Sequence, residues 1–289
     1  MLLLIFSCSR NAQQRQPNAE SLNVDEIPLY HTWYSLKEME YGMPFHPLPD
    51  EISPDGFFPW AGITSHHILA HEYLDAWFSR LAQMINPLRF YILSPDHYGV
   101  SLEPYSLTVG SWESGFGFVE SDRSKVRELI ELLEVDLDPG VFMVEHGVSA
   151  LMPYIKKYFP QAKVVAIIHG DESPVNTVIS GRLADVLENE FDETGKQENF
   201  LIISSDFSHK GGPEDTYIND NYSQQYLQNS ANNPWNMVFC DNLAGIYILD
   251  RLGKNNLESV IFYHTNSWEI SGHDKDDITS YFFVYFADK

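Results

Sequence analysis

The 289-residue chain is poor in cysteine and in basic residues, and it has no long apolar run. Its two cysteines, Cys8 and Cys240, lie in very different surroundings, so a disulfide scaffold does not organise the fold. Eighteen basic residues stand against 41 acidic ones, and the formal charge of −23 repels nucleic-acid phosphates and anionic lipids. No segment is apolar over the roughly 20 residues that a membrane-spanning helix needs. We therefore expect no nucleic-acid partner and no spanning helix.

The chain has ample material for a core, since 44% of its residues are hydrophobic and 14% are aromatic. This predicts one large globular domain over residues 24–289, of which 24–60, rich in proline and aromatics, is expected to be an irregular wrap. The start, MLLLIFSC, resembles the end of a bacterial lipoprotein signal, with Cys8 as lipid acceptor and a polar tether up to residue 23. Two locations stay open: the bacterial cell envelope, with membrane contact only through lipid on Cys8, or the cytoplasm.

From residue 60 onward, short apolar runs alternate with longer amphipathic stretches, which is typical of an α/β fold with helices covering a mostly buried sheet. The predicted strands are WAGIT, RFYILS, KVVAIIHG, FLIISS and the terminal YFFVYF. The predicted helices lie within residues 67–86, 122–135, 174–192 and 237–252.

Three of the predicted strands end in histidine-bearing loops. WAGIT leads into His66, RFYILS into His97, and FLIISS into Asp206 and His209. Ligands of open α/β sheets bind beyond the carboxyl ends of the strands, so these side chains are candidates for one site. His66 and His97 are natural metal ligands, because neutral imidazole binds Zn, Cu and Fe. Asp206 and His209 could instead form a pair in which the acid orients a proton-transferring imidazole.

Cys240 opens the predicted helix in WNMVFCDNLAGIYIL, where the helix dipole would favour a thiolate. A buried, inert cysteine is the common alternative. His67 and His71 have the spacing of a zinc protease, but Ile68 stands where the catalytic Glu belongs, so we interpret them as polar helix positions, one of which could line the pocket. A serine nucleophile in SSDFSH lacks the G-x-S-x-G elbow.

Five segments in order resemble the Memo family, also called AmmeMemoRadiSam system protein B. SSDFSHKG is similar to the family's S-S-D-F-x-H-x-G, GITSHH to G-I-x-P-H, and ILSPDH to I-L-G-P-S-H. EHGVSALMPY at 145–154 resembles E-H-S-I-E-x-x-L-P-F, and the segment 267–286 resembles the closing S-G-D-x-x-V-x-G-Y unit. Several weak motifs in the same order are much more specific than any one of them.

The resemblance implies a three-layer α/β/α fold with a central mixed sheet, similar to class III extradiol ring-cleaving dioxygenases. It assigns metal binding to His66, His97 and Cys240, and proton handling to His209 with Asp206. The side chains of His146, Asp96 and His67 are then expected around these ligands. The cofactor would be one transition-metal ion, Fe(II) or Cu(I), with Zn also open.

Two departures from the family pattern affect this site. Ser149 replaces the family's Glu in the EHGVS segment, although His146 is kept. Asn242 and its neighbours replace the glycine-rich stretch that commonly follows the cysteine.

Three functions remain open on the sequence alone. A metal-dependent redox or dioxygenase-like enzyme would use the bound metal to activate O2 or a hydroxylated substrate, with proton transfer by His209. A non-catalytic protein would use the same pocket to sequester a metal or bind a small molecule or peptide. A structural zinc site would need four protein ligands, and no fourth ligand of equal quality is found. Retention of Asp206 and His209 favours the enzyme.

Overall fold

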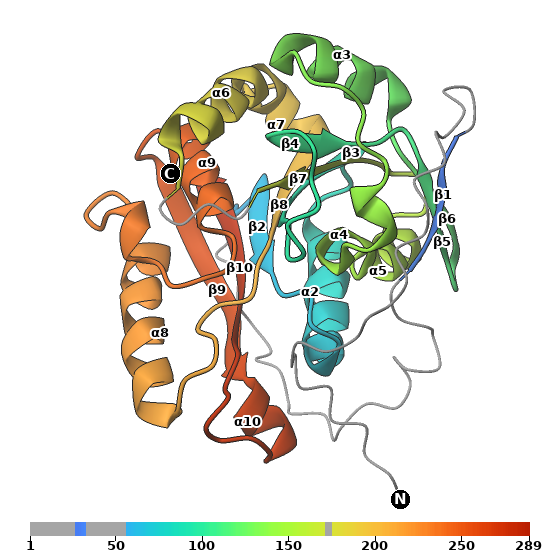
Figure 1. The fold of residues 1–289 in the computed structure, drawn as a ribbon. Coiled ribbons are helices and arrows are strands. Elements are labelled where there is room, and N and C mark those ends of the chain that lie inside the picture. Colours follow the sequence, from blue (N-terminus) through green and yellow to red (C-terminus); the bar gives the residue numbers. More distant parts are fainter. Residues whose placement is uncertain (1–26, 33–55, 171–174) are drawn as a thin grey trace, which may run out of the picture.

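The computed structural model describes residues 27–32, 56–170 and 175–289 of the chain (Figure 1). The predicted lipid-acceptor Cys8, the tether and most of the predicted wrap lie outside the described residues. Within the described ranges, no helix is long and apolar enough to cross a bilayer.

A seven-stranded sheet forms the centre of the molecule. Its strands, in spatial order, are β4 (Tyr105–Leu107), β7 (Lys163–His169), β3 (Arg89–Pro95), β8 (Asn199–Ser204), β2 (Ala61–Thr64), β10 (Ser280–Asp288) and β9 (Leu257–Asn266). The four neighbours β7, β3, β8 and β2 run parallel, whereas β4, β10 and β9 each pair antiparallel. The predicted mixed sheet is confirmed.

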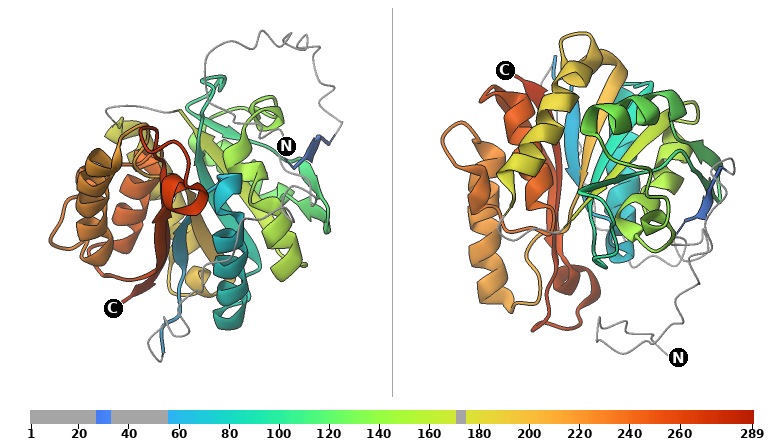
Figure 2. Two further views of the ribbon diagram at one scale, coloured as in Figure 1. Left: turned by 90° about the horizontal axis from the view of Figure 1, so that it is seen from below. Right: turned by 45° about the horizontal axis from the view of Figure 1, so that its top comes forward.

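Helices cover both faces of this sheet (Figures 1 and 2). One layer contains α2 (His71–Met84), α4 (His146–Ser149) and α5 (Met152–Tyr158); the other contains α3 (Arg123–Leu133), α6 (Thr177–Leu187), α8 (Pro213–Gln228) and α9 (Leu243–Gly253). Two further short helices are α7 (Gly195–Glu198) and α10 (Ser267–Ser271), and 3₁₀ turns span η1 (Ile68–Ala70), η2 (Val141–Met143), η3 (Glu188–Phe191) and η4 (Trp235–Met237). The predicted three-layer α/β/α class is confirmed.

Strand β3 shows why the sequence adopts this arrangement. Successive side chains of a strand point to opposite faces of the sheet. Phe90 and Ile92 join the core beneath α2 and α5, and Tyr91 and Leu93 join the core beneath α3, α6 and α9. Both faces are buried, so a parallel strand reads as a continuous apolar run, as RFYILS does.

A second, three-stranded sheet lies beside α5 at the edge of the molecule. It consists of β1 (Leu29–His31), β5 (Ser111–Ser114) and β6 (Gly117–Glu120). Tyr30 of β1 is buried, and its hydroxyl lies 2.6 Å from the Thr108 hydroxyl. Part of the segment expected to be an irregular wrap therefore contributes an ordered strand.

The predicted helices correspond to α2, α3, α6 and α9, whereas α8 and β9 were not predicted. In α8 most side chains are polar, as PEDTYINDNYSQQYLQ shows, and the apolar spacing that marks an amphipathic helix is weak. Its Pro213 at the first turn is a genuine start signal. The helix persists because Tyr226 and Leu227 reach the core.

Gly62, in the strand that leads to His66, offers a test of the packing. A Cβ at this position would lie 2.5 Å from a ring carbon of Trp77 and 2.8 Å from the carbonyl oxygen of Val284. We expect Gly62→Ala to lower the free energy of unfolding by about 1–3 kcal/mol, measured by urea denaturation, because neither the fully buried indole nor the backbone can yield freely.

Gly140→Ala is the matched control for this substitution. Its φ is −63°, and the nearest atom to an added Cβ is 3.9 Å away. We expect it to be neutral or to stabilise by about 0.4–1 kcal/mol. Equal unfolding midpoints for the two variants would contradict the packing described for β2.

Candidate metal centre

A cluster of imidazoles and carboxylates lies at the carboxyl ends of the neighbouring strands β3, β8 and β2. His66 follows β2 by two residues, His97 follows β3 by two, and Asp206 follows β8 by two. The first residue of α4, His146, and the loop residue Asp241 before α9 complete it. Two subsets have ligand atoms within 4.8 Å of one another: His66, His97 and His146, and His66, Asp206 and Asp241.

His66 is 2% exposed, and the hydrogen bonds of a neighbouring serine determine its tautomer. The Ser204 hydroxyl donates its proton to the carbonyl oxygen of Gly147 at 2.6 Å. Ser204 can therefore only accept from His66 Nδ1, which lies 3.0 Å away. The lone pair of His66 then resides on Nε2, the atom that faces the carboxylates of the cluster.

His97 is held in the same way, by a buried carboxylate. Glu145 accepts hydrogen bonds from His97 Nδ1 at 2.7 Å, from the His97 backbone N–H at 2.9 Å and from the Gly147 N–H at 2.7 Å. Glu145 is 1% exposed, whereas the His97 side chain is 21% exposed. A carboxylate on the far nitrogen of a ligating histidine fixes the ring and increases its basicity, as in many metalloenzymes.

Asp241 lies between the two imidazoles. Its Oδ2 is 3.5 Å from His66 Nε2 and 3.4 Å from His97 Nε2. The other oxygen, Oδ1, accepts hydrogen bonds from the Ser205 hydroxyl at 2.9 Å and from the Asp206 backbone N–H at 3.0 Å. The carboxylate is thus oriented, with one oxygen occupied by protein donors and the other directed at the imidazoles.

The next residue, Asn242, is fully buried and joins three strand ends to a helix. Its amide nitrogen donates to the carbonyl oxygens of Leu93 and Ser204, both at 2.9 Å. Its amide oxygen accepts from the Gly245 N–H that begins α9 and, at 2.8 Å, from His169 Nε2 at the end of β7. Asn242, noted above only as a departure from the family pattern, therefore fixes the backbone next to Asp241.

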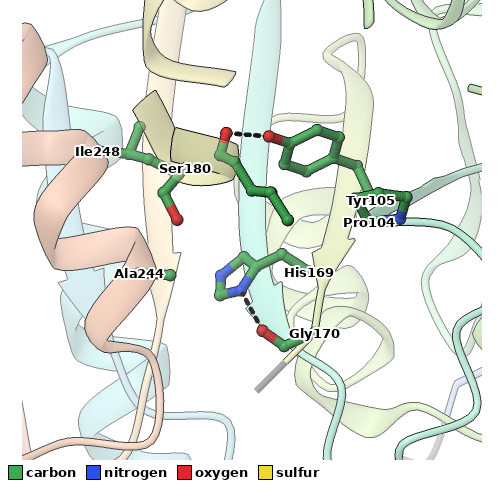
Figure 3. Close-up of a pocket in the computed structure, with 8 residues that line it drawn as sticks. Pro104, Tyr105, His169, Gly170, Ser180, Ala244 and Ile248 are labelled. Carbon is green, nitrogen blue, oxygen red and sulfur yellow. Dashed lines mark hydrogen bonds between the residues drawn. The ribbon is translucent and has the colours of Figure 1, made fainter. Parts of the chain in front are cut away.

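His169 also forms one wall of a small pocket beside the cluster. Figure 3 shows its imidazole directed toward Ala244 and Ser180, with the Tyr105 hydroxyl bonded to the carbonyl of Ile179 above it. None of the clustered histidines or carboxylates lines this pocket. The contact between His169 and Asn242 connects the wall of this pocket to the loop that carries Asp241.

Asp206 and His146 contact the cluster from two further directions. Asp206 accepts a 2.5 Å hydrogen bond from Ser65, and its other oxygen lies 3.8 Å from His66 Nε2. The His146 ring lies beside both other imidazoles, with ring centroids 5.1 Å from His66 and 4.4 Å from His97.

The electrostatics of the cluster stabilise positive charge at its centre. Burial disfavours the imidazolium of His66, but Asp206 and Asp241 outweigh burial and raise its pKa. Burial also disfavours the imidazolium of His97, but Asp241 and Glu145 outweigh burial and raise its pKa to about 10. Burial would also raise the pKa of Asp241, yet the two imidazoles hold it well below its usual range. Burial and the neighbouring imidazoles lower the pKa of His146 to about 3, so it stays neutral.

This arrangement fits a bound cation. With a cation bound, the two imidazoles would be neutral and would direct their Nε2 lone pairs toward the side of the buried carboxylates of Asp206 and Asp241. Nitrogen and oxygen donors of this kind suit Fe, Zn and Mn ions. The buried histidines and aspartates could therefore bind a metal ion, which would supply the positive charge that protons supply otherwise.

The remaining predicted residues lie nearby in differing roles. His67 precedes η1, outside the helix, and its Nδ1 lies 2.5 Å from the Tyr281 hydroxyl; burial lowers its pKa. Asp96 is buried and accepts from two backbone N–H groups of its own loop, Tyr98 and Ser101, so it shapes the loop that carries His97. His209 is exposed, and its charge contributes to lowering the pKa of Asp241.

Two predicted relationships are not found among the contacts of the described residues. Among the described residues, no hydrogen bond or ion pair joins Asp206 to His209; Asp206 is directed at Ser65 and His66 instead. Cys240 belongs to neither subset of the cluster. It is partly buried against the hydrophobic core on the α8 and α9 face, near Tyr226. Its assignment as a metal ligand stays a prediction.

Sequence analysis missed three residues of the site: Glu145, Ser204 and Asp241. Each is adjacent in sequence to a residue or motif that was considered, as in EHGVS, SSDFS and FCDN. The signal was an acid or hydroxyl next to a candidate ligand. This signal is weak, because the local path of the backbone determines which of two adjacent residues faces the site.

The profile of the Memo-like protein family matches residues 60–239. This chain belongs to the Memo family. The matched range contains His66, His97, His146, Asp206 and His209, and it stops one residue before Cys240.

Relatives in archaea agree with this assignment. A MEMO1 family protein of Caldivirga maquilingensis is 29% identical over 168 residues, covering 52% of this chain and 51% of the relative. The protein PAE0818 of Pyrobaculum aerophilum is 34% identical over 140 residues, or 46% and 47% of the two chains. One from Pyrobaculum arsenaticum is 28% identical over 224 residues, covering 73% and 77%. The chain spans about half the length of the first two relatives.

One solved structure shares the fold. The crystal structure of the uncharacterized protein JW3007 from Escherichia coli K12 superimposes with a TM-score of 0.51 at 12% identity, covering 79% of this chain and 99% of that one. At this identity the likeness concerns the fold alone. Together with the family match, it confirms the predicted Memo and extradiol-dioxygenase-like fold class.

The contact between Glu145 and His97 yields a testable prediction. Glu145→Gln removes the charge that orients the His97 ring, so we expect affinity for a divalent metal to fall about 10–100-fold. A competition titration with a metal-binding dye measures this. Glu113→Gln is the matched control, because Glu113 forms a 3.2 Å pair with His31 on the surface. If both variants bind metal as tightly as the unsubstituted chain, Glu145 does not support a ligand.

Proposed function

We propose that this Memo-family chain is a metal-dependent redox enzyme. One transition-metal ion is bound by Nε2 of His66 and of His97, and the substrate is a small hydroxylated molecule, with O2 as the oxidant. Fe(II) and Cu(I) suit this role, whereas Zn, which has no redox chemistry, suits only binding without redox catalysis. Both histidines lie within the part of the chain that matches the family profile.

The observation that carries the proposal is the fixed tautomer of the two histidines. Ser204 and Glu145 occupy the Nδ1 atoms, and both Nε2 atoms lie within 3.5 Å of one carboxylate oxygen of Asp241. Histidines that only pack in the core or stabilise the fold do not need both Nε2 atoms directed at one point beside buried carboxylates. A metal cation bound at this point explains why several ionisable groups are buried so close together, since isolated buried charges are costly.

A bound redox metal would supply a Lewis-acidic centre with open positions for O2 or a substrate hydroxyl. The residues of the chain would orient and exchange protons around it. Asp206, held by Ser65, lies beside His66 and can accept a proton from an approaching hydroxyl. His209 is exposed at the end of the same segment and can exchange that proton with solvent.

A second candidate function is metal or ligand binding without catalysis. The observation that favours it is that no hydrogen bond or ion pair joins Asp206 to His209 among the described residues, so a proton-transferring pair is not formed in advance. The same cluster would then hold a metal, or a small molecule or peptide, without turning over a substrate.

Substitution of a proposed ligand tests metal binding. We expect His66→Ala and His97→Ala to purify anaerobically with little or no transition metal, measured by elemental analysis together with an absorption spectrum before and after exposure to air. His264→Ala is the control, since His264 forms a 2.9 Å pair with Asp220 on another part of the molecule. Metal content unchanged in both ligand variants would refute the proposed site.

Substitution of His209 separates catalysis from binding. We expect His209→Ala to keep its metal but to lower turnover about 10²–10⁴-fold, the usual contribution of general acid–base catalysis. The assay is oxygen consumption by the iron-loaded protein with a panel of catechols. Asp206→Asn should act in the same direction. If the unsubstituted chain binds metal yet consumes no oxygen with any substrate of the panel, the non-catalytic function is favoured.

A further inference from the structure

We infer that the third protein ligand of this centre is the carboxylate of Asp241 and not the thiol of Cys240. The site is then a two-histidine, one-carboxylate centre that binds Fe(II) in preference to Cu(I). The inference rests on the proposed function, because it requires that a metal binds at His66 and His97. It states which residue supplies the negatively charged ligand. The type of this ligand in turn determines which metal the chain prefers.

The position of Asp241 Oδ2 is the first support. This oxygen is 3.5 Å from His66 Nε2 and 3.4 Å from His97 Nε2. A metal bound to both imidazoles would lie about 2 Å from each ligand atom. Its ligand atoms would then be roughly 3–3.5 Å apart from one another. The two separations from Asp241 Oδ2 therefore already match those of a coordination sphere, and ligand atoms of the two histidines lie within 4.8 Å of each other.

The fixed orientation of the carboxylate is the second support. Asp241 Oδ1 accepts from the Ser205 hydroxyl and the Asp206 N–H, and the Asp241 N–H itself donates to the Asp206 carbonyl at 3.0 Å. These contacts leave Oδ2 as the oxygen available to an ion. Hydrogen bonds to the outer atoms of a ligand are typical of metal centres, where they position it before the ion arrives.

The backbone around Cys240 is the third support. Asn242 holds the segment through the carbonyl oxygens of Leu93 and Ser204 and through the first turn of α9. Cys240, two residues earlier, is partly buried against the core on the α8 and α9 face. Bringing its thiol to His66 would displace Asp241 and break the contacts that Asp241 and Asn242 make.

Asp206 is the other carboxylate near the imidazoles of this cluster, and it is less well placed to bind a metal together with them. Its Oδ2 lies 3.8 Å from His66 Nε2, and its Oδ1 accepts the 2.5 Å hydrogen bond from Ser65. Asp241 is within 3.5 Å of both imidazoles, so it is the better bridge between them. Asp206 then remains beside the metal as a proton acceptor, in agreement with the role proposed above.

The identity of the third ligand determines the chemistry of the centre. A thiolate is a soft donor that favours Cu(I) and Zn, whereas an open two-histidine, one-carboxylate face is the usual arrangement of non-haem Fe(II) enzymes. With Asp241 as ligand, three coordination positions would remain for water, O2 and a substrate. With Cys240 as ligand, metal affinity would depend on the redox state of the thiol.

Cobalt(II) substitution distinguishes the two ligands without any assay of activity. Metal-free full-length protein is titrated with Co(II) under anaerobic conditions, because a cobalt–thiolate bond gives an intense near-ultraviolet charge-transfer band and a carboxylate does not. We expect no such band in the unsubstituted chain. Cys240→Ser should give the same visible spectrum and the same Co(II) affinity, whereas Asp241→Asn should bind Co(II) at least about 100-fold more weakly, beyond the range of outer-sphere changes.

The matched comparison is Asp206→Asn, which removes a neighbouring carboxylate of the same cluster and should cost less than Asp241→Asn. Thermal unfolding of each metal-free variant shows whether the variant folds. If one variant does not fold, the spectrum of the unsubstituted chain still shows whether a thiolate binds Co(II). A charge-transfer band that disappears in Cys240→Ser, or unchanged Co(II) affinity in Asp241→Asn, overturns the inference. Unchanged affinity in His66→Ala and His97→Ala instead overturns the proposed function itself.

Discussion

The side-chain amide of Asn242 is the interaction on which the centre of this molecule depends. It uses its full hydrogen-bonding capacity inside a dry interior, with two carbonyl oxygens accepting from its nitrogen and two N–H groups donating to its oxygen. The partners belong to β3, β7, β8 and α9. Because an unsatisfied buried amide is costly, these four elements are held in one relative position. Two of these strands, β3 and β8, lead directly into the loops that carry His97 and Asp206.

The ionisable groups of the cluster are stabilised in different ways. Buried carboxylates are stable only with compensating charge or hydrogen bonds, and Asp241 has both. Glu145 has a different environment, since it is balanced by His97 and by two backbone N–H groups. His146 stays neutral because burial, together with the positive charge of the neighbouring imidazoles, lowers its pKa. The histidines are therefore not equivalent, although all three lie within one small volume.

The fold was predictable from sequence because its strands are buried on both faces. RFYILS, KVVAIIHG and FLIISS are continuous apolar runs with one possible explanation in an α/β chain. The polar helix α8 and the strand β9 could not be predicted in this way, because their burial depends on partners far along the chain. The positions of His66 and His97 in the cluster were predictable from their place after strands. The position of Asp241 was not, because it depends on hydrogen bonds of Asp241 and Asn242 that sequence spacing does not reveal.

The imidazoles of the cluster are unequally exposed, so the cluster is open to solvent from one side. His66 is closed off by the sheet and by Ser204, with 2% of its side chain exposed, whereas the side chains of His97 and His146 are each 21% exposed. Solvent and small molecules therefore meet the cluster from the side of the β3 and α4 loops. The shape of those two loops, more than the composition of the ligand set, then decides which molecules are admitted and in which orientation they arrive.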